Sequence, residues 1–311
     1  MQGHYSYPGA TPYVHRLAYE DGVRNHTYQP RPEDHPALRS DLESRTGSLS
    51  SQETVTIEPK RGPVARYFLA EINPRRTYLL LIICSFIAGL VDALSYNAWS
   101  TFTGMQTGNT VFMALGASNQ PSYPDYLWAK ALIAFSVYLT SNFFFTYVAR
   151  ALTPLRRTTM LLIFGLQTLA LLIAALLVEL EVILPRPEEY TAPIQWTQIF
   201  AIALLAFSQA GQISASRILG YNEVPTLSVT TILADMLADP HLFELHNPKR
   251  NRRLAGFIAS FVGAMTSGFL SRETEMVACL WLAMALKVVV TLCFFVWRDD
   301  RETEKKDLEG Q

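Results

Sequence analysis

Six long apolar stretches alternate with polar segments between residues 77 and 297, and each is long enough to cross a bilayer as a helix. A hydrocarbon core of about 30 Å requires about 20 apolar residues in a helix. Helix is the expected state, because an isolated strand would leave its backbone groups unpaired in lipid. The pattern therefore predicts an all-α, polytopic membrane protein with transmembrane helices over residues 77–97, 127–149, 158–178, 197–217, 254–271 and 277–297.

Two further segments are too apolar for ordinary loops and too short for crossings. Each begins with polar residues and continues as a short helix, over residues 107–117 and 226–238. Helices of this length suit re-entrant or interfacial positions. The alternative is that both lie flat on the membrane surface.

The order of span, polar break, short helix, span and span occurs twice along the chain. Ala88–Ala93 corresponds to Ala210–Ala215 at a constant offset, and Asn109–Val111 corresponds to Thr230–Ile232 after a one-residue gap. With three spans in each unit, the second copy would enter the membrane upside down. We therefore expect an inverted 3+3 repeat, a plan that many secondary transporters use with the site near the midplane.

Small residues recur every four positions in the first and fifth spans. Ser85, Gly89 and Ala93 form one such row, and the row in the fifth span runs from Gly256 to Gly268. Rows of this kind let helix backbones approach closely. We interpret them as packing surfaces rather than as a ligand groove.

Lys and Arg residues gather in alternate loops, which sets the expected orientation. The basic residues precede the first span and follow the second, fourth and sixth, whereas the other loops contain only Arg186 and Arg272. Because basic loops stay on the cytosolic side, both termini are predicted to be cytosolic.

The polar ends of the chain flank a membrane domain expected over residues 73–298. Residues 1–72 have no apolar core, which argues against a signal peptide and predicts a disordered cytosolic tail. Its tyrosines suit either docking and phosphorylation or a solvated tail without a fixed partner. Residues 299–311 form a second cytosolic tail.

Composition and motifs narrow the class of function. The net charge of −1 gives no indication of a nucleic-acid partner. The chain lacks the metalloprotease, nucleophile-elbow, phosphate-loop and dinucleotide motifs, so we expect neither an enzyme nor a cofactor. His241 and His246 lie near Asp239 and Glu244, where a metal site is the alternative to a solvated loop.

Charged residues inside apolar spans are the first candidates for function, since burying a charge in hydrocarbon is costly. Asp92 lies in the first span and Lys287 in the sixth. The two side chains would either pair with each other or act in solute coupling. Lys130 is expected to extend toward the interface.

The polar breaks supply a second group of candidates with uncharged donors and acceptors. Free N–H groups at helix N-termini favour an anion or a carboxylate, although ordinary capping of two short helices uses the same atoms. The break residues and the glutamine of the fourth span that we assign to the candidate site are Gln106, Thr107, Asn109, Thr110, Gln212, Thr230 and Thr231.

Several of these residues form a pattern with a known family. Gly89–Ala93, then Tyr96, then Thr107–Thr110 resembles the hallmark of the YoaK-like membrane family, domain of unknown function 1275, and Ala210–Gln212 fits its second half. The long polar tail is similar to a fungal-type extension. The resemblance implies a membrane fold over residues 75–297 and brings no established activity.

The leading hypothesis is a transporter of a small polar or anionic solute, or of an ion, with its site at the repeat interface. The alternative is a membrane scaffold or assembly factor that binds partners through its tail and basic loops. A polar cavity beside Asp92 would favour the transporter, and a tightly packed interior would favour the scaffold.

Overall fold

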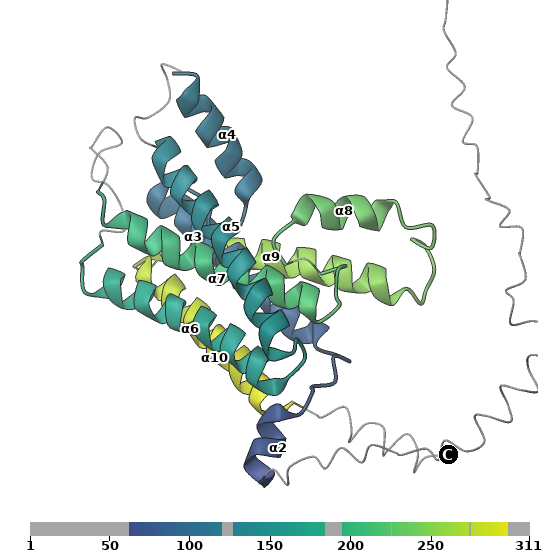
Figure 1. Cartoon of the computed structure of the whole chain (residues 1–311). Helices are drawn as coiled ribbons and strands as arrows, with labels where there is room; N and C mark the ends of the chain where they lie inside the picture. Colours follow the sequence, from purple (N-terminus) through teal and green to yellow (C-terminus); the bar gives the residue numbers. More distant parts are fainter. Residues whose placement is uncertain (1–61, 120–126, 184–194, 225, 274, 298–311) are drawn as a thin grey trace, which may run out of the picture. The chain divides into compact units, whose positions relative to one another are not determined.

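A computed structural model describes residues 62–119, 127–183, 195–224, 226–273 and 275–297 (Figure 1). The chain divides into Met1–Pro59 and Lys60–Gln311, and the described residues all belong to the second unit. The tail predicted for 299–311 and all but the last part of the tail predicted for 1–72 lie outside the described residues.

The described residues form helices joined by short connections. Six of these helices are long and apolar enough to cross a membrane, which confirms the predicted all-α, polytopic class. The helices are α2 (Pro63–Leu69), α3 (Tyr78–Trp99), α4 (Gln106–Ala117), α5 (Leu127–Leu152), α6 (Arg157–Glu179), α7 (Gln198–Ile218), α8 (Val229–Leu237), α9 (Pro248–Glu273) and α10 (Val277–Val296).

Helix α9 begins six residues before the apolar stretch that predicts it. Its first turns contain the basic segment Lys249–Arg253. The Asn247 side chain accepts the backbone N–H of Arg250 at 3.0 Å, as a capping residue does, and Pro248 suits the first helical position. Capping therefore extends the helix beyond the part that hydropathy identifies.

Contacts at the helix ends fix the direction of each long helix. The Lys130 ammonium at the start of α5 donates to Gln198 at the start of α7, near Trp99 at the end of α3. At the opposite end of the bundle, the Trp297 indole donates to the carbonyl of Asn73 at 2.8 Å. Successive long helices therefore run in opposite directions, and both ends of the membrane region lie at the end of the bundle where α3 begins. We call this the Tyr78 end and the opposite one the Trp99 end.

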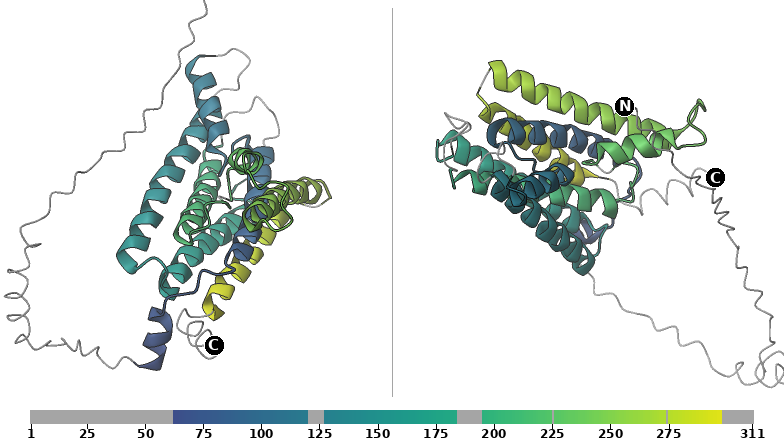
Figure 2. Two further views of the ribbon diagram at one scale, coloured as in Figure 1. Left: turned by 90° about the vertical axis from the view of Figure 1, so that its right-hand side faces the viewer. Right: turned by 90° about the horizontal axis from the view of Figure 1, so that it is seen from above.

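The long helices pack in pairs, and each pair contains one helix from the first half of the sequence and one from the second. Helix α3 packs on α9 and α5 on α7, while α6 and α10 lie side by side (Figures 1 and 2). The short helices α4 and α8 pack on α5 and α9, respectively. The remaining contacts among these eight helices join α3 with α10, α6 with α7, α3 with α7, α5 with α6 and α9 with α10.

Glycines bring α3 and α9 into backbone contact. A Cβ atom on Gly89 would lie 1.9 Å from the carbonyl oxygen of Ser260, and one on Gly263 would lie 2.0 Å from that of Phe86. Real Cβ atoms do not approach so closely. The small-residue rows therefore pack as the sequence indicates, although the close contact on α9 is made by Gly263.

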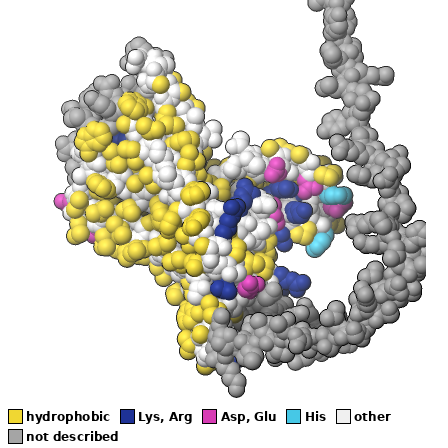
Figure 3. Space-filling model, viewed as in Figure 1, with side chains coloured by type: hydrophobic (Ala, Val, Ile, Leu, Met, Phe, Trp, Pro, Cys, Tyr) yellow, Lys and Arg dark blue, Asp and Glu magenta, His cyan; other side chains and the backbone are white. Residues whose placement is uncertain are grey.

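Hydrophobic side chains cover much of the surface over the long helices, whereas charged side chains gather around the connection between α8 and α9 (Figure 3). Phe143 on α5 and Phe261 on α9, for example, are 74% and 58% exposed. An apolar surface of this kind is suited to contact with lipid chains.

Replacing Gly89 with Ala is expected to destabilise the protein by about 2 kcal/mol, because the added methyl group must separate α3 from α9. Gly165→Ala is the matched control. Its Cβ would meet nothing within 4 Å, so the change should be neutral or slightly stabilising. Thermal denaturation in detergent micelles measures both variants. Equal melting of the two would contradict the close contact.

Candidate functional site

Asp92 fixes the non-helical segment between α3 and α4, which we call the first break. Its Oδ1 atom accepts the backbone N–H groups of Thr103 at 2.9 Å and Gly104 at 2.7 Å, and the Thr103 hydroxyl at 3.1 Å. Asp92 lies seven residues before the end of α3, so the break returns about 10 Å along the helix. The short helix α4 then starts beside the inner part of α3, as a re-entrant helix does.

Asn109 and Gln106 satisfy the backbone of the same break from the α4 side. The Asn109 amide donates to the carbonyl of Phe102 at 2.7 Å, and its oxygen accepts the N–H of Phe102 at 3.2 Å. The Gln106 amide donates to the carbonyl of Thr103 at 2.8 Å. Asn109 and Gln106 therefore fix the break, while Thr107 and Thr110 are exposed on α4.

The second break, between α7 and α8, has corresponding hydrogen bonds. Ser95 donates to the carbonyl of Thr101 at 2.7 Å, and Ser216 donates to that of Val224 at 2.8 Å. Each of these carbonyls lies two residues before a threonine, and each short helix begins three residues after that threonine. Thr103 and Thr226 therefore have the same spacing to the short helix that follows each of them, and the predicted site residues Thr230 and Thr231 are exposed on α8.

The two threonines differ in their hydrogen bonding. The Thr103 hydroxyl is paired with Asp92, whereas the buried Thr226 hydroxyl has no partner among the described residues. The register that aligns Gly89 with Gly211 places Ser214 opposite Asp92, and Ser214 donates to its own helix. Thr226 also has a φ of 60°, a strained conformation for a β-branched residue.

The breaks meet beside α3 and α9, where they enclose a cavity of about 260 Å³. A Cβ atom on Gly104 would lie 2.9 Å from both Asp92 Oδ2 and Leu227 Cδ2, so the first break touches the second. Ser260, midway along the 26-residue α9, lies on the cavity wall. We call this space the break cavity. Its described lining is mainly apolar, and its polar side chains belong to Asp92, Thr226 and Ser260.

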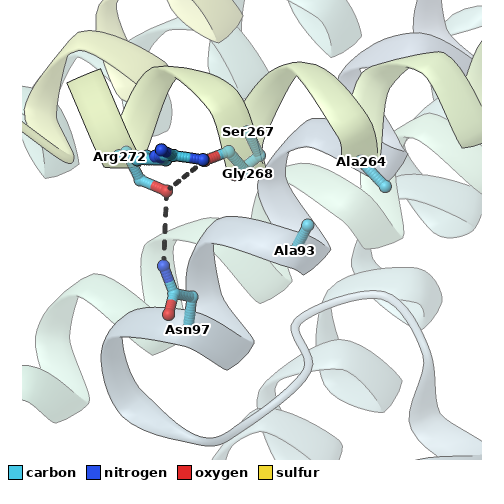
Figure 4. A pocket seen from close by; sticks show the side chains of 7 residues that line it. Ala93, Asn97, Ala264, Ser267, Gly268 and Arg272 are labelled. Atoms are coloured by element: carbon cyan, nitrogen blue, oxygen red, sulfur yellow. Dashed lines mark hydrogen bonds between the residues drawn. The ribbon is translucent and has the colours of Figure 1, made fainter. Parts of the chain in front are cut away.

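A second cavity, of about 440 Å³, continues along the α3–α9 contact toward the Trp99 end (Figure 4). We call it the seam cavity. It shares Ala93 and Ala264 with the break cavity. Asn97 donates to the Ser271 hydroxyl at 3.3 Å across it, and the exposed Arg272 lies at its edge. The two cavities thus lie next to each other along the seam.

Lys287 does not pair with Asp92, which corrects one of the two expected arrangements. Its ammonium donates to Gln212 Oε1 at 2.6 Å, and the Gln212 amide donates to the carbonyl of Cys84 at 2.9 Å. On the facing helix α6, the buried Gln167 amide lacks a hydrogen-bond partner within the described region. Lys287 and Gln212 therefore belong to a polar layer separate from the break cavity.

Lys130 is also buried, at the Trp99 end of the bundle. Its ammonium donates to Gln198 Oε1 at 2.7 Å, with the carbonyl of Trp99 at 3.5 Å. At the Tyr78 end, Arg252 pairs with Glu223 at 2.7 Å and lies over the ring of Tyr221, 5.1 Å from its centroid. Lys130 thus joins α5 to the end of α3. In the same manner, Arg252 joins α9 to the segment just after α7.

The connection between α8 and α9 is held by its own polar contacts. Hydrogen bonds from the Asn247 amide and from the His241 N–H, with the nearby Arg253, lower the pKa of the Asp239 carboxyl. His241 pairs with Glu244 at 2.5 Å. Across the described residues, no group of three or more His, Cys, Asp or Glu side chains is arranged to hold a metal.

Two polar residues that line the break cavity, Thr226 and Ser260, are not among the site residues that the sequence predicts. Ser260 belongs to the small-residue row of the fifth span, and Thr103, which binds Asp92, lies just before the predicted short helix over residues 107–117. The different pairing of Thr103 and Thr226 depends on Asp92, which has no counterpart in α7.

Comparisons with known proteins agree with the helical pattern and the motif around the first break. The family described as "Protein of unknown function (DUF1275)" matches residues 80–293. The chain belongs to this family and is an integral, multi-pass membrane protein. Neither the curated proteins nor the solved structures contain a significant match.

Replacing Asp92 with Ala should lower the free energy of unfolding by about 3 kcal/mol, because buried donors of Thr103 and Gly104 lose their acceptor. Asp92→Asn keeps an acceptor oxygen and should cost less. Asp235→Ala, on the exposed face of α8, is the control. Thermal denaturation of the purified proteins gives the comparison, and a wild-type melting curve for Asp92→Ala would exclude this role.

Proposed function

We propose that the protein is a small-solute transporter whose binding site is the break cavity. The observation that carries the proposal is the contact of two interrupted segments, at Gly104 and Leu227, beside a cavity halfway along α9. Irregular backbone at membrane depth is tolerated where protein buries it or where it lines a cavity. Broken helices that meet in this way form the sites of many secondary transporters.

The packing of the helices supports an inverted 3+3 repeat. If α3, α4, α5 and α6 are exchanged with α7, α8, α9 and α10, each contact among these helices becomes another observed contact. The pair α3–α9 becomes α7–α5, and the pair α4–α5 becomes α8–α9. Near the ends of α3 and α7, Ser95 and Ser216 each donate to a carbonyl of the break that follows.

The cations Lys130 and Arg252 give further support to the repeat. Lys130 on α5 contacts the end of α3 and the start of α7. Arg252 on α9 lies near Tyr221, just after α7, and over Tyr78 at the start of α3, 4.7 Å from the ring centroid. Lys130 lies at the Trp99 end and Arg252 at the Tyr78 end, as an inverted arrangement requires.

The proposed route leads from the break cavity to the Trp99 end through the seam cavity, past Ala93 and Ala264. Toward the Tyr78 end, the Arg252–Glu223 pair and the rings beside it cover the seam. By the distribution of Lys and Arg, the Trp99 end would face away from the cytosol. The site would then open toward that side in this conformation.

A membrane scaffold is the alternative, and Phe243 and Leu245 favour it. These side chains are 93% and 100% exposed in the α8–α9 connection, next to Lys249. They would suit a partner surface. The break cavity favours transport, since a scaffold has no need for a cavity between two broken helices. The proposed transporter moves its solute without covalent change.

Uptake into proteoliposomes tests the proposal, with a radiolabelled panel of amines, amino acids, sugars and organic acids. We expect saturable uptake of at least one class. Ala264→Trp should abolish it by filling both cavities, and Ile258→Trp, exposed on the same helix, is the matched control. Lys287→Met should reduce uptake if the buried ammonium takes part in coupling. Absence of uptake across the panel would favour the scaffold.

Cysteine labelling tests the route independently of the solute. In a protein whose native cysteines are replaced by Ala, Ala264→Cys should react with a charged, water-soluble thiol reagent. Ala283→Cys, fully buried in the core, should not react. The rate at Ala264 should exceed that at Ala283 by at least about tenfold, measured by mass spectrometry. Similar rates at the two positions would argue against an aqueous route.

A further inference from the structure

We propose that the break cavity selects a small organic cation, an ammonium group attached to a compact apolar body. This inference rests on the proposed function, since it names the class of solute for the same site. It replaces the polar or anionic solute that helix N-termini suggest from the sequence. The charge, size and hydrogen-bonding groups of the cavity all lead to it.

The charge of the cavity comes from Asp92. It is the only charged side chain in the described lining, and no Lys or Arg of the described chain forms an ion pair with it. The Oδ1 atom is stabilised by three hydrogen bonds, but these donors are uncharged. An organic cation in the cavity would supply the missing counter-charge, and an anion would be repelled.

The apolar lining selects the body of the ligand. The rings of Phe102, Phe257 and Phe261 lie on the wall, together with Leu227. Aromatic faces attract cations as well as apolar groups. The volume of about 260 Å³ is below the roughly 300–1,000 Å³ of pockets for drug-sized ligands. The site therefore suits a molecule about the size of a single ring with a short side chain.

Thr226 supplies the second polar contact. Its hydroxyl is buried on the cavity wall, and it has no hydrogen-bond partner in the described part of the chain. A buried polar atom without a partner is costly, so a ligand donor would satisfy it. An ammonium group has three N–H donors and no acceptor, which suits the Asp92 carboxylate and the hydroxyl lone pairs of Thr226.

The donors that would recognise an anion are already used. The N–H groups of Thr103 and Gly104 at the first break bind Asp92, and the N–H of Phe102 binds Asn109. A carboxylate ligand would have to displace these contacts and approach Asp92 itself. The first break therefore offers a ligand hydrogen-bond acceptors rather than donors. Its backbone N–H groups resemble those of an anion site, but they are already paired.

The experiment compares three probes with the same phenyl body: 2-phenylethylamine, 2-phenylethanol and phenylacetate. Isothermal titration measures their binding to the full-length protein in nanodiscs, with empty nanodiscs as the blank. We expect saturable binding of the amine, weaker binding of the alcohol by on the order of tenfold, and none of the acid. Asp92→Asn should bring the amine and alcohol affinities close together, an effect that a purely structural role would not produce.

Thr226→Val keeps the shape of the side chain and should weaken amine binding severalfold. Asp235→Asn, exposed on α8, and Thr140→Val, exposed on α5, are the matched controls and should bind like wild type. A preference for phenylacetate, no binding of any probe to the folded protein, or an unchanged amine preference in Asp92→Asn would each overturn the inference. Thr226→Val remains informative if Asp92→Asn fails to fold.

The outcomes separate the two proposals. If the amine binds in the cavity but no solute enters proteoliposomes, the transport function fails and the cation selectivity stands. If proteoliposomes take up another class of solute and the amine does not bind, the cation inference fails and transport stands.

Discussion

The fold depends on how two breaks in helical structure are accommodated inside an apolar region. Each break exposes backbone N–H and C=O groups that lipid cannot satisfy. At the first break, the carboxylate of Asp92 accepts the N–H groups of Thr103 and Gly104, and the amide of Asn109 pairs with both backbone groups of Phe102. These side chains satisfy the backbone where the chain turns back along α3, and the same turn brings a carboxylate to the cavity wall.

The second break uses the same plan with a different polar content. Ser216 pairs with the carbonyl of Val224 as Ser95 pairs with that of Thr101, but α7 has no acid at the position of Asp92. The hydroxyl of Thr226 therefore remains without a described partner. In the proposed repeat, the absence of an acid at this position of α7 would thus leave an open hydrogen-bonding position at the second break.

The sequence predicts the helical class well because apolar runs respond directly to the bilayer. It also indicates that Asp92 and Asn109 have a structural or functional role, since a polar side chain in an apolar segment is costly unless it is paired. It does not reveal partners across the bundle: Lys287 binds Gln212, and Lys130 is buried against Gln198. Those contacts depend on which helix faces are adjacent, and hydropathy does not specify this. Gln167 lies in the middle of a predicted span that has no charged residue. This single polar side chain was the feature of the sequence that indicated the polar layer.

The α3–α9 and α5–α7 seams correspond under the proposed repeat but are filled differently. Backbones touch at Gly89 and Gly263 in the first seam, whereas the ring of Phe145 packs against Gly211 in the second. The first seam has a cavity beside its contact, and the Phe145 ring, tilted against that of Phe207, fills space in the second. In a carrier built from inverted units, such a difference is expected between a seam that is open and one that is closed. The cation on each side, Lys130 or Arg252, would then stabilise the closed end of its own half, because each one joins the helices that must separate.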